Sequence, residues 1–228
     1  MKKEKILKIL QALEKKYTRN EIIELKYINN YTLLLAVLLS AQATDKGVNK
    51  ATEPLFKIAK TPQEILNLGE EKLLNYLKSI NYYKTKTKHI IELSKILIEK
   101  YNSQVPNTRE DLENLPGVGR KTTNVILNIA FNTRVIAVDT HVFRVANRIG
   151  LVKANNVLDT EKELYKVIPE NYIEFMNHWL VLLGRYICKA KNPNCQNCPL
   201  NKLCEKVGIR KIRIYSLKLK NFNNRKVK

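Results

Sequence analysis

Long apolar segments are missing from this sequence of 228 residues. The longest uninterrupted apolar run, Leu33 to Leu39, is far too short to cross a bilayer as a helix. The first ten residues, MKKEKILKIL, are charged throughout and lack the apolar core of a secretory signal peptide. The sequence therefore predicts no membrane association, and nothing in it indicates an oxidising compartment.

Strand-like alternation of apolar and polar residues is also scarce, and repeats and Gly/Ser-rich linkers are absent. Threonine–glutamate capping boxes mark two helix starts, at Thr61 and at Thr160. Long helices are expected over residues 84–101 and 171–187. Apolar residues recur at the i, i+3, i+4 and i+7 positions of a helix, first at Ile6, Ile9, Leu10 and Leu13. These patterns predict an all-α protein.

Histidine and cysteine, the usual metal ligands, are both rare. The three histidines are not closely paired, so a histidine-based metal site is not expected. The only cysteines lie near the C-terminus with the spacing C-x6-C-x2-C-x5-C, at Cys188, Cys195, Cys198 and Cys204. Four thiolates in so short a stretch suit an iron–sulfur cubane or a tetrahedral zinc ion. Two short disulfides or free thiols are the alternative.

Acidic residues are few compared with basic ones: 21 Asp and Glu stand against 41 Lys and Arg, for a net charge of +20. Nine basic residues and one acid fall in the last 24 residues, 205–228. Such an excess favours a polyanionic partner, of which nucleic acid is the leading candidate. The alternative is genomic, because lysine outnumbers arginine 31 to 10, as an A/T-rich genome would encourage.

Two short helices joined by a glycine-rich turn are expected near the middle of the chain. Thr108 begins the first helix and Pro116 ends it. The turn Gly-Val-Gly then leads directly into a second helix, whose free N–H groups make a natural anion site. This arrangement predicts a helix-hairpin-helix that grips the DNA backbone without reading sequence. Its candidate DNA contacts are Gly117, Val118, Gly119 and Arg120. The alternative is a plain connection between helices.

Lys121 and Asp139 are the candidate catalytic residues. Lys121 begins the second helix, where the positive end of the helix dipole and Arg120 both disfavour its ammonium form, so it could act as a nucleophile. Asp139 is the predicted N-cap of a helix that runs towards Arg148, a position that keeps a carboxylate ionised. Residue types alone leave a phosphate-contacting lysine and a purely structural cap equally possible.

Five motifs, taken together and in order, resemble one family. They are LLSAQATD (38–45), LPGVGRKT (115–122), VDTHVFRV (138–145), HWL (178–180) and the cysteine spacing. The resemblance is to the endonuclease III family, the bifunctional base-excision glycosylases of the helix-hairpin-helix superfamily that hold a [4Fe–4S] cluster. It extends from about residue 1 to 206.

The resemblance implies an all-α fold of two domains with the DNA cleft between them. A six-helix barrel domain containing the hairpin is expected over residues 23–133. Residues 1–22 and 134–228 are expected to form the iron–sulfur cluster domain with a basic C-terminal tail. Lys121 and Asp139 would then face each other across the domain boundary.

The resemblance also implies a reaction. A damaged pyrimidine in double-stranded DNA is flipped out of the stack, and the amine of Lys121 attacks C1′ of its sugar. The base leaves, a Schiff base forms, and β-elimination breaks the strand on the 3′ side. Asp139 would activate Lys121 and stabilise positive charge on the sugar. Abasic sites would be cleaved in the same way, by a monomer working in the bacterial cytoplasm at the nucleoid.

Further DNA contacts follow from the family. Gln42 matches the position that fills the gap left by the flipped base. Where the family has a glycine–leucine pair whose leucine wedges the duplex open, this chain has Asn81 and Tyr82, and the Tyr82 ring could stack on an exposed base. The basic residues around the first cysteine are expected to contact phosphates: Arg185, Lys189 and Lys191. Polar helix ends and solvated charge are the alternatives.

Three rival interpretations stay open at this point. The adenine-removing branch of the same superfamily shares the cluster and the aspartate, but it usually lacks the hairpin lysine and has an extra C-terminal domain. A non-catalytic DNA-binding module would use the hairpin and the basic surface alone, without Asp139 or Gln42. Zinc in place of iron is the third, and a brown protein would exclude it.

Overall fold

The computed structural model describes residues 1–17 and 23–209, and within them every regular element is a helix. The all-α prediction is therefore confirmed. A 3₁₀ turn, Glu170–Tyr172, and a π-helical turn, Leu183–Ile187, flank the last α-helix. The α-helices are α1 (Lys3–Lys16), α2 (Asn30–Ser40), α3 (Asp45–Ile58), α4 (Pro62–Leu68), α5 (Glu70–Leu77), α6 (Tyr83–Tyr101), α7 (Arg109–Glu113), α8 (Arg120–Phe131), α9 (Thr140–Ile149), α10 (Val157–Val167) and α11 (Ile173–Leu182).

Most of the predicted helix starts are confirmed. Thr61 and Glu64 form the expected reciprocal capping box of α4, and Thr108 caps α7 through the N–H of Asp111. The predicted start at Thr160 is wrong, because α10 begins three residues earlier, at Val157.

Asn156 is the true cap of α10. Its side chain accepts from the N–H of Asp159, so the helix has already begun when the chain reaches Thr160. Thr160 lies inside the first turn, and its hydroxyl donates to the carbonyl of Asn156. Asn156 therefore caps the helix, and the threonine–glutamate pattern at Thr160 does not mark a helix start.

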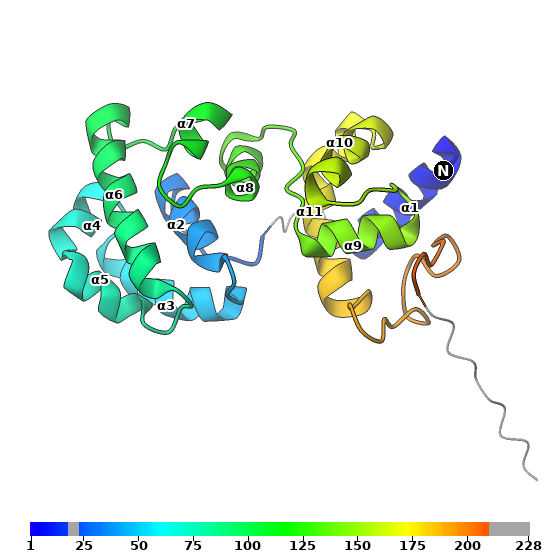
Figure 1. Cartoon of the computed structure of the whole chain (residues 1–228), viewed down its shortest axis with the longest axis horizontal. Helices are drawn as coiled ribbons and strands as arrows, with labels where there is room; N and C mark the ends of the chain where they lie inside the picture. The colour runs from blue at the N-terminus through cyan, green and yellow to red at the C-terminus, as the bar shows by residue number, and fades with distance from the viewer. Residues whose placement is uncertain (18–22, 210–228) are drawn as a thin grey trace, which may run out of the picture.

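Two lobes are visible in Figure 1. Helices α2 to α8 form the first lobe, and α1 joins α9, α10, α11 and the C-terminal loop in the second. Each lobe has its own hydrophobic cluster, and the assignment of residues changes from one cluster to the other at positions 136–138. The predicted domain limits, 23–133 against 1–22 and 134–228, stay a prediction.

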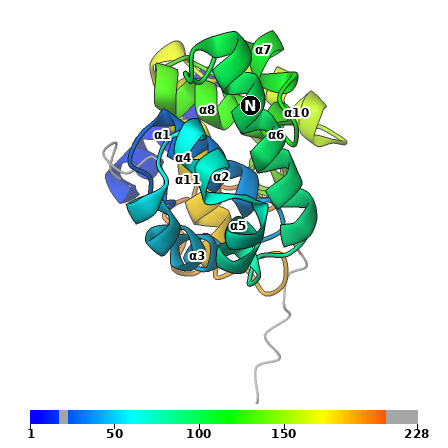
Figure 2. The ribbon, with the colours of Figure 1, turned by 90° about the vertical axis from the view of Figure 1, so that its left-hand side faces the viewer.

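The first lobe is built around α2, which the other helices surround in the end-on view (Figure 2). Every residue from Tyr31 to Leu39 is buried. The longest apolar run of the sequence is thus a core helix, and each fully buried leucine in it contributes about 1.5–3 kcal/mol relative to exposure. Across the described residues, no helix has the length and apolar character needed to span a membrane.

The second lobe depends on the two ends of the chain. The predicted apolar face of α1 is buried, with Ile9, Leu10 and Leu13 fully excluded from solvent. It belongs to the same cluster as Trp179 of α11 and Cys188 of the C-terminal loop. The N-terminal helix therefore stabilises the part of the chain that holds the cysteines.

Two groups of ion pairs connect the lobes. Arg120 at the start of α8 donates from Nε and Nη2 to both carboxylate oxygens of Glu161 on α10, at 2.9 and 2.8 Å. The Glu161 side chain is 5% exposed, whereas that of Arg120 is 47% exposed. Arg185, just after α11, pairs with Glu24 and with Asp45 of α3. These contacts attach the start of α8 to α10, and the turn after α11 to α3 and Glu24.

The unequal burial of Arg120 and Glu161 gives a stability prediction. Arg120→Ala should lower the free energy of unfolding by about 1–3 kcal/mol, because it leaves a carboxylate buried without its donors. Glu161→Gln should cost less, because the amide still accepts and the arginine is half in water. Urea unfolding measures both.

The control for this pair is Lys166→Ala, which removes an exposed ion pair with Glu163 from the same helix and should change stability by about 0.5 kcal/mol or less. A larger loss for Glu161→Gln than for Arg120→Ala would contradict the assigned burial.

Candidate active site and cluster site

The two oxygens of Asp139 have different partners. Asp139 is the N-cap of α9, as predicted, and its Oδ1 accepts from the N–H groups of His141 and Val142 at 2.8 and 2.9 Å. Its Oδ2 lies 4.0 Å from Nζ of Lys121, on the first turn of α8. One carboxylate thus caps a helix of the second lobe and faces an amine of the first.

Lys121 and Asp139 line one cavity of about 90 Å³ at the boundary of the lobes. Apolar groups such as Val125 of α8 share its wall with polar ones, Asn177 and His178 of α11. The side chain of Lys121 is 52% exposed and that of Asp139 only 17%. The amine is therefore accessible to a ligand, while the carboxylate behind it is held in place.

The hairpin has the expected geometry. Gly117 has φ +76°, and a Cβ there would lie 2.6 Å from Nδ1 of His89, so both conformation and space require glycine. Val118 is buried in the core of the first lobe, and Gly119 is the N-cap of α8. The N–H groups at the start of α8 precede the intrahelical hydrogen bonds, as at any helix N-terminus, and offer an anion site.

Arg120, a predicted phosphate contact, is hydrogen-bonded to Glu161 of the second lobe. Its hydrogen bonds with Glu161 raise the pKa of its guanidinium. Sequence analysis did not find Glu161, because the start of α10 was predicted at Thr160 and the position of Glu161 within that helix was therefore not recognised. Arg120 thus joins the hairpin to the second lobe next to Lys121.

Gln42 and Tyr82 come from two loops that meet. Gln42 follows α2 with φ 56°, Tyr82 precedes α6 with φ 60°, and both side chains are exposed. Nδ2 of Asn81 donates to the carbonyl of Gln42 at 2.8 Å.

Lys86, which was not predicted from the sequence, is buried and donates to the carbonyls of Leu39 and Ala41 at the end of α2.

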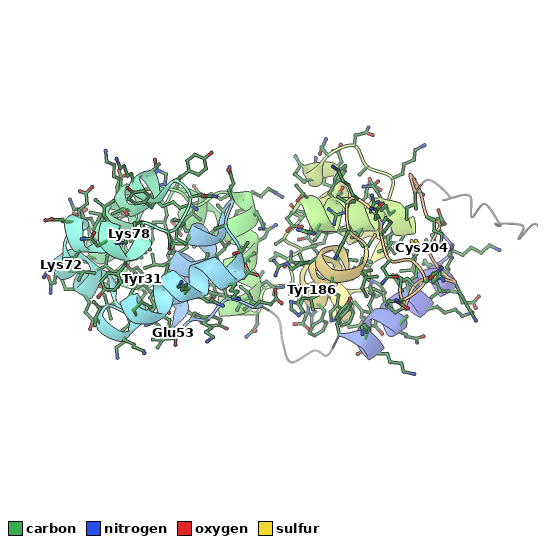
Figure 3. The ribbon with its side chains drawn as sticks, turned by 90° about the horizontal axis from the view of Figure 1, so that it is seen from below. Tyr31, Glu53, Lys72, Lys78, Tyr186 and Cys204 are labelled. Carbon is green, nitrogen blue, oxygen red and sulfur yellow. The ribbon has the colours of Figure 1, made fainter. Side chains whose placement is uncertain are left out.

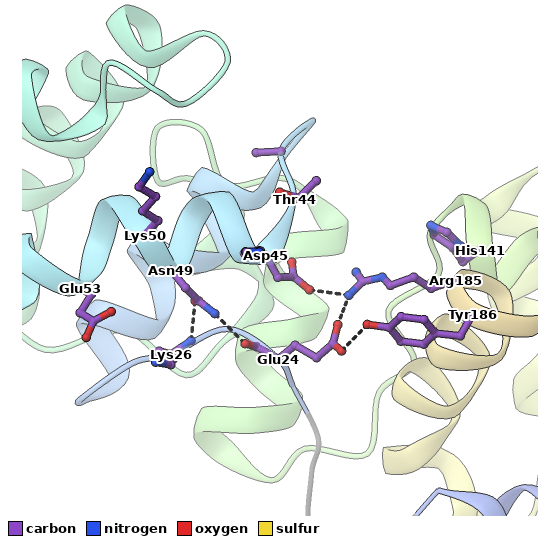
Figure 4. A pocket seen from close by; sticks show the side chains of 12 residues that line it. Glu24, Lys26, Thr44, Asp45, Asn49, Lys50, Glu53, His141, Arg185 and Tyr186 are labelled. Atoms are coloured by element: carbon purple, nitrogen blue, oxygen red, sulfur yellow. Dashed lines mark hydrogen bonds and ion pairs between the residues drawn. The ribbon is translucent and has the colours of Figure 1, made fainter.

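Arg185 lies on the wall of a larger cavity, about 840 Å³, between the lobes. Figure 4 shows its guanidinium between Asp45 and Glu24, with the hydroxyl of Tyr186 donating to Glu24 at 2.8 Å. In Figure 3, Tyr186 lies on the side of the second lobe that faces the first. Lys189, in contrast, is fully available on the surface, as is Lys191 on the same loop.

The four cysteines meet in the second lobe and line one cavity. None of them is in a disulfide, which removes that alternative. Backbone and side-chain donors already point at their sulfurs: the N–H of Lys206 lies 3.3 Å from Sγ of Cys204, and Nη1 of Arg148 lies 3.7 Å from Sγ of Cys188. Such N–H···S contacts are what thiolate ligands of a metal cluster require.

One further observation favours an iron–sulfur cluster over a single zinc ion. In the part of the chain that the structure describes, no three His, Cys, Asp or Glu side chains gather closely enough for one metal ion. A zinc ion with bonds of about 2.3 Å needs its sulfurs almost in contact, whereas a cubane fills a wider shell.

The hydroxyl of Tyr17 is buried without a protein partner, and its ring belongs to the same hydrophobic core as Cys198. Burial raises the pKa of Tyr17 to about 12, so it stays a donor.

Known proteins match both parts of this architecture. The family described as "HhH-GPD superfamily base excision DNA repair protein" matches residues 35–170, and "Iron-sulfur binding domain of endonuclease III" matches residues 188–204. The endonuclease III of Buchnera aphidicola subsp. Schizaphis graminum is 50% identical over 205 residues, which are 90% of this chain and 98% of that protein. The endonuclease III of Escherichia coli is 47% identical over 205 residues, 90% of this chain and 97% of that protein.

A solved structure agrees with the sequence matches. A trapped covalent intermediate of an endonuclease III with DNA superimposes with a TM-score of 0.83 at 42% identity, over 90% of this chain and 97% of that chain. The iron–sulfur match begins at Cys188 and ends at Cys204, so the four cysteines of the second lobe fit a [4Fe–4S] cluster. The chain belongs to the HhH-GPD superfamily of base excision DNA repair proteins and, within it, to the endonuclease III family.

Proposed function

We propose that this protein removes damaged pyrimidines from double-stranded DNA and then cleaves the abasic site on its 3′ side, with Lys121 as the nucleophile. The observation that carries the proposal is the Lys121–Asp139 pair, an accessible amine 4.0 Å from a partly buried carboxylate in a cavity between two lobes. A flipped nucleotide that enters this cavity brings C1′ of its sugar to the amine.

The reaction conserves atoms and electrons without an external reactant other than a final water. The lone pair of the Lys121 amine forms a bond to C1′, the bond from C1′ to the base breaks, and the base leaves with that pair and a proton. The nitrogen lone pair then forms a double bond to C1′ as the C1′–O4′ bond breaks, and O4′ takes up the remaining proton of the amine. The resulting imine makes C2′ acidic. Loss of the C2′ proton expels the 3′ phosphate by β-elimination, and water later releases the amine.

Asp139 acts on this reaction through its Oδ2. The carboxylate takes the proton of the attacking amine and stabilises the positive charge that develops on the sugar. Its Oδ1 is held by two N–H donors of α9, so the group needs no reorganisation during the reaction. The apolar wall formed by residues such as Val125 limits water beside the reacting atoms.

The remaining surfaces hold the DNA. The N–H groups around Gly119 and the turn 117–119 bind phosphates of the strand, and Lys189 and Lys191 bind phosphates from the cluster side. Gln42 fills the gap in the duplex, and Tyr82 stacks on the exposed base. Arg185 reaches a phosphate only after it releases Glu24 or Asp45.

The [4Fe–4S] cluster supplies the cross-link that holds the cysteine loop in one shape. The surrounding residues present Lys189 and its neighbours to the DNA: Arg148 donates to the carbonyls of Lys189 and Ala190 at 2.6 and 2.9 Å. The protein acts as a monomer on nucleoid DNA in the bacterial cytoplasm. The basic residues from 210 onward lie outside the described residues.

An adenine-specific glycosylase is the nearest rival. The observation against it is the accessible amine of Lys121 opposite Asp139, which an enzyme without lyase chemistry does not need. A non-catalytic DNA-binding module would need neither residue in the cavity. Both rivals predict that no covalent intermediate forms.

Lys121→Gln should abolish the covalent adduct that borohydride traps on duplex DNA containing one thymine glycol, because an amide cannot form an imine. DNA affinity should change little, which electrophoretic binding assays measure. The matched control is Lys72→Gln, which removes one exposed lysine far from the lobe boundary (Figure 3) and should leave trapping intact. An adduct that persists in Lys121→Gln would move the nucleophile elsewhere.

Asp139→Asn should lower kcat by about 10²–10⁴-fold with little change in KM, because the amide still caps α9 but no longer accepts a proton. Asp139→Ala should lose both functions, so its thermal stability falls as well. Single-turnover kinetics and thermal unfolding separate the two effects. Equal rates for Asp139→Asn and the unmodified protein would show that the carboxylate is only a cap.

Cys198→Ala should remove the cluster, which loss of bound iron and of the brown colour would report. Proteolysis should then occur within residues 189–203, while the helices of the first lobe keep their circular dichroism signal. Because the loop carries Lys189 and Lys191, DNA affinity should also fall. Recovery of zinc in place of iron from the unmodified protein would contradict the assignment of the cluster.

A further inference from the structure

Two exposed loops of the first lobe share an unusual backbone conformation. Gln42, between α2 and α3, and Tyr82, between α5 and α6, both lie in the left-handed region. This region is unfavourable for residues with a Cβ, and it persists only where the surroundings impose it. Neither residue is a glycine or an asparagine, the types that adopt it most readily. Something outside these two residues must therefore hold the loops.

The start of α6 supplies that support. Asn81, next to Tyr82, donates from Nδ2 to the carbonyl of Gln42 at 2.8 Å. One turn further along, Nζ of Lys86 donates to the carbonyls of Leu39 at 2.9 Å and of Ala41 at 2.6 Å. Asn81 thus holds the peptide after Gln42, and Lys86 holds the chain immediately before it.

Lys86 is fixed more firmly than a surface lysine. It is 7% exposed, and its ammonium lies at the C-terminal end of α2, where the helix dipole favours positive charge. Burial lowers the pKa of Lys86. The loop around Gln42 therefore has a rigid attachment on one side, and the Asn81 hydrogen bond is the exposed, adjustable one on the other.

We propose that Asn81 is a positioning residue that couples Gln42 to Tyr82 and thereby sets which base the enzyme tolerates opposite the damaged pyrimidine. The inference rests on the proposed function, in which these two side chains enter the duplex together. The hydrogen bond fixes the peptide plane of Gln42, and with it the direction in which the Gln42 side chain leaves the loop.

The chemistry of the two side chains divides their tasks. An aromatic ring such as Tyr82 stacks on any base, so it adds affinity without discrimination. The Gln42 amide both donates and accepts, and guanine and adenine present different donors and acceptors on their pairing edges. Discrimination between opposite bases therefore depends on the orientation of Gln42, which Asn81 controls. A residue without a side chain at position 81, such as glycine, could not provide this contact.

The test compares single-turnover cleavage of thymine glycol opposite guanine and opposite adenine. In the unmodified protein the two rates should differ. Asn81→Ala should move their ratio towards one by about fivefold, the loss expected for one hydrogen bond, while cleavage itself continues. Asn81→Asp, which cannot donate and repels the carbonyl of Gln42, should do the same or more. The control Asn67→Ala removes an exposed amide that accepts from Gln63 on α4 and should leave the ratio unchanged.

A double-mutant cycle shows whether Asn81 acts through Gln42. In a Gln42→Ala background, Asn81→Ala should have no further effect on the ratio. The free energy of unfolding of Asn81→Ala should fall by no more than about 1 kcal/mol, because one hydrogen bond of an exposed residue is lost. 2-Aminopurine placed opposite the lesion should fluoresce less in complexes of Asn81→Ala, since the unpaired base stacks more freely.

The outcomes separate this inference from the proposed function. If the unmodified protein forms no borohydride-trapped adduct, the proposed function fails. If the adduct forms but the ratio is already near one, or stays unchanged in Asn81→Ala, only the role of Asn81 fails. An additive effect of Asn81→Ala in the Gln42→Ala background would equally rule out positioning through Gln42.

Discussion

The proposed active site depends on one carboxylate with two separate roles. Asp139 uses one oxygen to cap α9 and turns the other towards the amine of Lys121. The cap lies in the second lobe, and Lys121 belongs to the first. The Lys121–Asp139 pair therefore exists only when the two lobes keep their relative position. A helix cap, usually a matter of local stability, here orients a functional group at the boundary between domains.

The lobes are held by charge as well as by packing. Arg120, the residue before Lys121, joins the start of α8 to Glu161. The helix turn that carries the amine is therefore attached to the second lobe. Arg185 repeats this on the far side of the cavity through Asp45. Because both residues are basic, the proposed function assigns the same side chains to the contacts between the lobes and to the DNA surface. The chain is a base excision repair glycosylase in which Arg120 and Arg185 are paired with carboxylates of the protein itself.

Local patterns predicted the local structure well. The capping box at Thr61, the apolar face of α1 and the cap at Asp139 were each visible in a few neighbouring residues, and the structure confirms them. The contacts that the sequence did not predict all join residues far apart in the chain, such as Asn81 with Gln42 and Arg120 with Glu161. No periodicity or cap marks such a pair. The predicted start of α10 was wrong because Asn156, earlier in the chain, caps the helix N-terminus that Thr160 was expected to cap.

The most direct test of the account is to locate the covalent bond itself. The borohydride-reduced complex with duplex DNA carrying one thymine glycol can be digested with protease and nuclease and mapped by mass spectrometry. We expect the residual sugar fragment on Nζ of Lys121. A fragment on the amino group of Met1, or on any other lysine, would contradict this expectation and would leave Asp139 facing an amine that takes no part in the reaction.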